Sequence, residues 1–137
     1  MLPLAYDFQR IGDAAQAVEL LMPYAPEWHH FVVMNRSFYK LTPALCSYLV
    51  QQGHVYAHQQ SGSALVLGAR FSPQEAIHIG LFAGDGAACL NFAQQKAYQA
   101  GIAQISCIFP QSAIHIQNML MKHEFVPHPS PYIVMRV

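Results

Sequence analysis

The sequence predicts a single domain of the mixed α/β (α+β) class, in which a mainly antiparallel β-sheet is flanked by helices. The first observation is a continuous apolar run at residues 76–83, typical of a buried strand. A glycine turn at 84–86 and a helical pattern at 87–101 follow it. The second observation is another strand and helix pattern within residues 102–123. The third is a pair of strand-like segments around the turn 61–63, which predicts a β-hairpin.

The N-terminal part predicts one strand, one helix and a connector. Residues 3–10 alternate between apolar and polar side chains, as a strand does. Asp13 is a suitable N-cap for the helix that follows. We predict that residues 23–37 form an irregular connector, because two prolines fall in them. Trp28 in this segment is expected to act as a packing anchor.

The next segment predicts a second helix followed by a hairpin. Thr42 as N-cap and Pro43 at the first helical position begin the helix, and Gly53 ends it. Residues 54–60 and 64–71 then form two strands. We expect these strands and the first one to lie antiparallel beside the strand at 76–83.

The C-terminal half completes the predicted order β-α-α-β-β-β-α-β-α-β. The strand at 76–83 leads into a helix that ends at Gly101. A strand at 102–109, a helix at 112–123 and a last strand at 132–137 follow. All of these elements form one domain, because 137 residues leave little room for a second one.

Composition and charge exclude several classes of protein. Seven Lys and Arg balance seven Asp and Glu, and neither sign forms a run, which argues against nucleic-acid binding. No apolar run reaches the ~18 residues of a membrane span, and no export signal is visible. Only 10% of the residues are charged, so we expect an apolar face to pair two copies as a homodimer.

The cysteines and histidines predict no metal site. Cys46, Cys89 and Cys107 lie far apart in apolar segments, which is typical of buried, reduced thiols in a cytoplasmic protein. The eight histidines show no zinc-ligand spacing.

The second half of the chain resembles the GNAT superfamily of N-acetyltransferases. The resemblance lies in the strand IHIGLFA, the turn GDGAA with its helix ending in AYQAG, the strand ISCIF and the helix ending in KHEF. It implies a sheet that splays apart between its fourth and fifth strands, with coenzyme A in the gap. It also implies transfer of an acyl group from acetyl-CoA to an amine acceptor.

The resemblance further implies a cofactor site and a general base. The pantetheine would follow the end of the 76–83 strand and the pyrophosphate would lie on the start of the next helix, where N–H groups favour anions. The base would be His78 or Glu75, at or near this strand. The implied cofactor-binding residues are Leu81, Phe82, Ala83, Gly84, Asp85, Gly86 and Ala87.

Three departures from the family pattern leave a second function open. Leu81 stands where the phosphate loop usually has Gln or Arg, and the carboxylate of Asp85 would repel a phosphate. Leu120 stands where many members have a Tyr that acts as a general acid. The alternative is a GNAT-fold domain that has lost catalysis and serves in binding or dimerisation. In that case His78 is simply a histidine hydrogen-bonded within the sheet.

Overall fold

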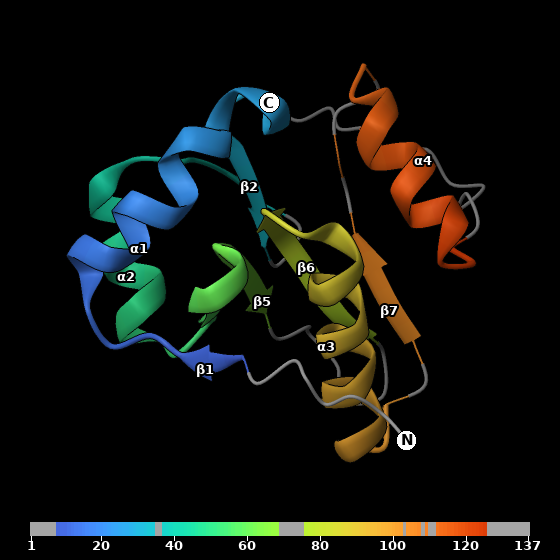
Figure 1. The fold of residues 1–137 in the computed structure, drawn as a ribbon. Coiled ribbons are helices and arrows are strands. Elements are labelled where there is room, and N and C mark those ends of the chain that lie inside the picture. The colour runs from blue at the N-terminus through green and yellow to red at the C-terminus, as the bar shows by residue number, and fades with distance from the viewer. Residues whose placement is uncertain are drawn as a thin grey trace.

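A computed structural model describes residues 8–34, 37–68, 76–102, 104–107, 109 and 112–125 (Figure 1). The α-helices within them are α1 (Ala14–Leu21), α2 (Pro43–Gln51), α3 (Gly86–Gln99) and α4 (Ile114–Lys122). Two 3-10 helices are η1 (Met22–Trp28) and η2 (Gln59–Ser61). The strands are β1 (Gln9–Arg10), β2 (Phe31–Met34), β3 (Ser37–Lys40), β4 (Val55–His58), β5 (Ser63–Gly68), β6 (Ala76–Ala83) and β7 (Gln104–Cys107).

A five-stranded mixed sheet forms the centre of the fold. Its order is β1-β4-β5-β6-β7, and the first three pairings are antiparallel. Only the pairing of β6 with β7 is parallel, as expected for strands joined through a crossover helix. The predicted fold class and the antiparallel arrangement of the strands before 76–83 are therefore confirmed.

Helix α3 crosses over the sheet between β6 and β7. It covers the face of these strands that is turned to the viewer in Figure 1, and it contacts β5, β6 and β7. Small side chains at Ala88, Ala93 and Ala97 are buried in this contact, so the helix backbone lies close to the sheet. Helices α1 and α2 pack together on one side of the molecule, and α4 lies on the other.

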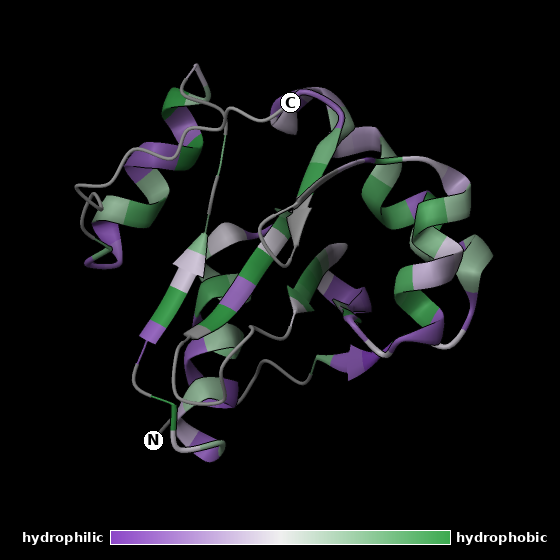
Figure 2. Ribbon diagram, turned by 180° about the vertical axis from the view of Figure 1, so that it is seen from behind, coloured by the Kyte–Doolittle hydropathy of each residue, from purple (hydrophilic) through white to green (hydrophobic). Residues whose placement is uncertain are grey.

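Helices α1, α2 and α3 begin and end close to where the sequence predicts, whereas α4 (Ile114–Lys122) is shorter than the predicted 112–123. The carboxylate of Asp13 accepts a 3.0 Å hydrogen bond from the Ala15 N–H and caps α1. The Thr42 hydroxyl accepts one of 3.1 Å from the Leu45 N–H at the start of α2. Gly101 has a φ of 72° directly after α3, a conformation that favours glycine. Figure 2 shows hydrophobic and hydrophilic bands along α4, as expected for a helix packed on one face.

The predicted connector at 23–37 is wrong. The structure has η1 there, followed by an antiparallel hairpin of β2 and β3. The run Phe31–Met34 is of a strand-forming type, but the preceding prolines masked that signal. Val32 is fully buried and β2 contacts β6, so packing on the sheet stabilises the hairpin. Trp28 is 2% exposed and is a packing anchor, as predicted.

Several predicted strands are longer than the observed ones. Strand β4 ends at His58, where η2 begins, so residues 59 and 60 are not strand. Strand β7 is the middle part of the predicted 102–109. The start of the predicted 3–10 strand and the whole predicted strand at 132–137 lie outside the described residues.

Candidate functional site

The parallel pairing between β6 and β7 stops before β6 ends. The last aligned pair is Ile79 with Cys107. Strand β6 continues to Ala83, and over this stretch β5 is its strand partner within the described residues. We call residues 80–83 the half-paired segment, because one backbone edge of it has no strand partner in the described part of the sheet. Within the described residues, the β6–β7 ladder therefore ends at this pair.

Strand β6 contains a β-bulge at Gly80. Val66 of β5 pairs with Leu81, whereas the next residue, Leu67, pairs with Ile79. Gly80 is thus an extra residue in β6 that has no counterpart in β5. A bulge bends its strand and increases the local twist. A glycine inside an apolar strand is a sequence signal for a bulge, and our sequence interpretation missed it.

The predicted cofactor-binding residues of β6 could contact a cofactor through their backbone, because their side chains are buried. Leu81, Phe82 and Ala83 are all buried. The Phe82 ring packs edge-on against Trp28 of η1, with ring centroids 5.4 Å apart. A molecule bound beside the half-paired segment would therefore contact the strand backbone rather than these side chains.

Gly84 makes the turn from β6 into α3. Its φ is 86°, which L side chains rarely adopt. A Cβ at this position would lie 2.7 Å from the carbonyl oxygen of Gly62 and from the Cα of Ser63. The turn before β5 thus packs directly on the turn before α3, and this contact requires glycine.

The carboxylate of Asp85 caps α3. Its Oδ1 accepts a 3.2 Å hydrogen bond from the Ala88 N–H. The Asp85 N–H in turn donates to the Oγ of Ser63 at 2.9 Å. The N–H groups of Asp85 and Ala88 therefore already have acceptors within the protein. The negatively charged carboxylate of Asp85 also lies at this end of the helix.

Met119 of α4 covers the first residue of α3. A Cβ on the buried Gly86 would lie between 3.1 and 3.3 Å from three atoms of the Met119 side chain. No feature of the sequence placed this methionine or Ser63 at the start of α3, because both contacts depend on tertiary packing.

Two side-chain contacts join η1 to the N-terminal end of α4. Oε1 of Glu27 lies 3.0 Å from Nε2 of His115. Nε2 of His29 lies 2.8 Å from the Ser112 hydroxyl. Both contacts are exposed, so each stabilises the fold only slightly. They hold η1, with Trp28 at its end, next to α4.

His78 lies on β6, one residue before the last aligned pair of the β6–β7 ladder. Its Nδ1 is 2.9 Å from the Oγ of Ser106, and the two residues are aligned directly across from each other in the β6–β7 ladder. This is the hydrogen bond within the sheet that our alternative interpretation of His78 expects. The other predicted base, Glu75, lies outside the described residues.

The cysteines do not supply a nucleophile. Burial raises the pKa of Cys89 to about 12, and burial also raises the pKa of Cys107 and of Cys46. All three thiols are therefore protonated at neutral pH, and a thiol in this form is a poor nucleophile. Cys46 and Cys89 are buried, as predicted, and Cys107 is half-buried.

Two further observations concern only the described part of the chain. No group of three or more His, Cys, Asp or Glu side chains in it is arranged to hold a metal ion. Among its helices, none combines the length and the apolar character needed to cross a membrane.

Comparison with solved structures supports the fold. The chain is similar to TTHA1254 from Thermus thermophilus, with a TM-score of 0.56 and 14% identity over 76% of this chain and 87% of that one. A point mutant of the same protein gives a TM-score of 0.55 and 14% identity, over 76% and 88% of the two chains. At this identity the likeness shows a common fold. The sequence matches no protein-family profile and no curated protein.

Proposed function

We propose that this chain is a divergent GNAT-like N-acyltransferase, which transfers an acyl group from a coenzyme A thioester such as acetyl-CoA to an amine. The observation that carries the proposal is the half-paired segment of β6, which continues beyond the last aligned pair with β7 and leads straight into α3. From α2 to α4 the order of the described elements is the one that the GNAT resemblance implies, whereas the β2–β3 hairpin before α2 is not part of that order. An assignment to the cytoplasm stays a prediction.

The half-paired segment suits the pantetheine arm of coenzyme A, which contains amide groups. A strand edge without a strand partner has N–H and C=O groups that can pair with an extended, amide-containing chain. Pantetheine is such a chain, and it carries the acyl thioester at its end. The thioester supplies an activated acyl carbonyl. The buried Leu81 and Ala83 keep this part of the strand rigid, so the edge is fixed in place.

The pyrophosphate of the donor does not fit on the start of α3 as this end is built. The Asp85 carboxylate occupies the Ala88 N–H and would repel a phosphate, and Met119 covers Gly86. The start of α3 therefore contributes no phosphate contact to the proposed reaction. We expect donor affinity to come from the strand edge and to be weakened by Asp85.

His78 is the residue that best suits removal of a proton from the amine. The Ser106 hydroxyl engages Nδ1, so the proton would be taken at Nε2, which is buried in the structure and must become exposed before an amine can reach it. Imidazole has an unperturbed pKa of about 6.5, which suits proton transfer near neutral pH. In this role Ser106 is a positioning residue, since it fixes the ring without touching the amine.

The proposal is tested by an acyl-transfer assay. Purified protein is mixed with acetyl-CoA and a set of primary amines, and the released thiol and the acetylated amine are both measured. We expect both products with at least one amine. We expect His78→Gln to lower kcat by at least about a hundredfold, the lower end of typical general-base effects. Ser106→Ala should shift the pH profile and leave KM for acetyl-CoA unchanged. Absence of both products with every amine would contradict the proposal.

A second candidate is a GNAT-like domain without catalysis that acts in binding or dimerisation. Specific contacts favour it: Met119 covers the start of α3, and Phe82 packs on Trp28 beside the half-paired segment. Phe31 of the β2–β3 hairpin is 42% exposed, which provides apolar surface for pairing two copies. A stable dimer in analytical ultracentrifugation that Phe31→Glu dissociates, together with failure of the transfer assay, would support this candidate.

A further inference from the structure

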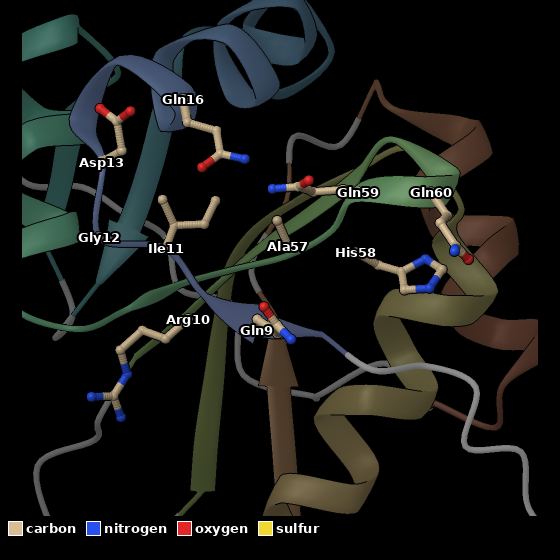
Figure 3. Close-up of a pocket in the computed structure, with 10 residues that line it drawn as sticks. All are labelled: Gln9, Arg10, Ile11, Gly12, Asp13, Gln16, Ala57, His58, Gln59 and Gln60. Carbon is tan, nitrogen blue, oxygen red and sulfur yellow. The ribbon is translucent and has the colours of Figure 1, made fainter.

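A polar pocket lies where β1, the start of α1, the end of β4 and η2 meet (Figure 3). Its volume is about 530 Å³. Small-molecule sites typically have volumes of roughly 300–1,000 Å³, so the pocket is of suitable size. None of the residues that line it belongs to the half-paired segment of β6 or to the start of α3.

The pocket combines an apolar floor with walls of carboxamides. Ile11 and Ala57 form the floor and are 5% and 4% exposed. Figure 3 shows the carboxamides of Gln16 and Gln59 pointing toward each other across this floor, with Gln9 below them. The three glutamines come from α1, η2 and β1, so the fold brings together groups that are distant in the sequence.

The charged residues at the pocket are engaged elsewhere. Figure 3 shows the Arg10 guanidinium turned away from the glutamines, and its Cζ lies 5.9 Å from the centre of the Tyr56 ring. The carboxylate of Asp13 accepts the Ala15 N–H as the cap of α1. The lining has one cation, Arg10, and one anion, Asp13, so its formal charges cancel, and the pocket suits an uncharged ligand best.

The carboxamides are available to a ligand. In the part of the chain that the structure describes, those of Gln9, Gln16 and Gln59 form no hydrogen bond with another side chain. Each carboxamide offers two donors and one acceptor oxygen. The adjacent His58 ring is held by the Ser61 hydroxyl at 2.8 Å and stacks on Phe8, so this wall of the pocket is fixed.

We propose that this pocket binds a neutral polyhydroxylated small molecule, of the sugar or polyol class. Neighbouring hydroxyls both donate and accept, which matches carboxamides that approach from several sides. The C–H face of such a molecule would lie on Ile11 and Ala57. The pocket is separate from the site proposed for acyl transfer, so the proposal of polyol binding can be tested independently of the proposed function.

The test is a titration followed by NMR on isotope-labelled protein. The probes are D-glucose and myo-inositol, with glucose 6-phosphate as a charged analogue and N-acetylalanine methylamide as a neutral amide. We expect saturable shifts of the side-chain NH₂ signals of Gln9, Gln16 and Gln59 with a neutral polyol at millimolar concentration. The phosphate ester and the amide should bind more weakly than the best neutral polyol.

Substitutions locate the site. Gln16→Leu and Gln59→Leu should each weaken polyol binding about fivefold to tenfold, as expected for loss of one hydrogen bond. Gln99→Leu, at an exposed position of α3 outside the pocket, should leave binding unchanged. The proposal is overturned if neither polyol causes saturable shifts in the wild-type protein, or if the amide binds more tightly. Equal effects of Gln16→Leu and Gln99→Leu would overturn it as well.

Discussion

The N–H of Asp85 donates a 2.9 Å hydrogen bond to the Oγ of Ser63, and this bond joins the start of α3 to the β4–β5 hairpin. Ser63 is fully buried, and its hydroxyl also lies 2.7 Å from that of Ser61. Next to this bond Gly84 packs against Gly62 and Ser63. The position of the α3 N-terminus, where the GNAT resemblance places the cofactor, is therefore set by a hairpin about twenty residues earlier in the chain.

Ser63→Ala tests how much the hydrogen bond between Asp85 and Ser63 contributes to the stability of the fold. The substitution leaves the Asp85 N–H without its acceptor, and we expect it to lower the free energy of unfolding by about 1–2 kcal/mol. Urea denaturation followed by circular dichroism measures the loss. Ser61→Ala is the matched control, because Ser61 is exposed and its loss should cost less. Equal stability of the Ser63 variant and the wild type would show that the bond does not hold α3.

Gly84→Ala and Gly101→Ala separate backbone strain from steric contact. Both glycines have a positive φ, 86° and 72°, but a Cβ at Gly101 meets nothing within 4 Å. We expect Gly101→Ala to lower stability by roughly 1–2 kcal/mol through the backbone alone. Gly84→Ala should cost clearly more, because its Cβ would meet backbone atoms at 2.7 Å. Thermal denaturation compares the two, and similar losses would contradict the close contact of the turns.

Asp85 is expected to act as a helix cap. Asn caps a helix about as well as Asp, so Asp85→Asn should leave thermal stability nearly unchanged. Asp85→Ala removes the acceptor of the Ala88 N–H and should lower stability by about 1 kcal/mol. Equal melting temperatures for the Ala and Asn variants would show that the cap contributes nothing.

His54 makes stability depend on pH in a defined direction. Burial, with a smaller contribution from Arg10, lowers the pKa of His54 below its ordinary value of 6.5. The unfolded chain then binds the proton more readily than the folded chain. The contribution of this group is therefore complete above pH 6.5 and is lost as the pH falls below it. Urea unfolding at about pH 7.5 and about pH 5.5 should show a smaller difference for His54→Gln than for the wild type. An unchanged difference would contradict this assignment.

Local signals in the sequence were sufficient for most of the fold. Caps at Asp13 and Thr42 and the terminal Gly101 placed helix ends, because their effects act within one turn. The apolar run at 76–83 identified the central strand for the same reason. The hairpin of β2 and β3 was missed because prolines at 23 and 26 outweighed its short strand signals.

The candidate site was predictable only in part. The sequence pointed to the turn at 84–86, and Asp85 does cap α3. The contacts of Ser63, Ser106 and Met119 join residues that are far apart along the chain, so no local pattern reveals them. The bulge at Gly80 lies directly after the last aligned pair of β6 and β7, and the sequence signals it only as a glycine within a strand.

Isothermal titration with acetyl-CoA tests the central claim most directly. We predict saturable binding to the wild-type protein at micromolar to millimolar strength, roughly −8 to −4 kcal/mol. Asp85→Asn should bind more tightly, and the gain should shrink at high salt, because a repulsive charge has been removed. The Asp85→Ala variant controls for loss of the cap. No detectable binding by either the wild type or Asp85→Asn up to millimolar ligand would contradict the acyltransferase proposal.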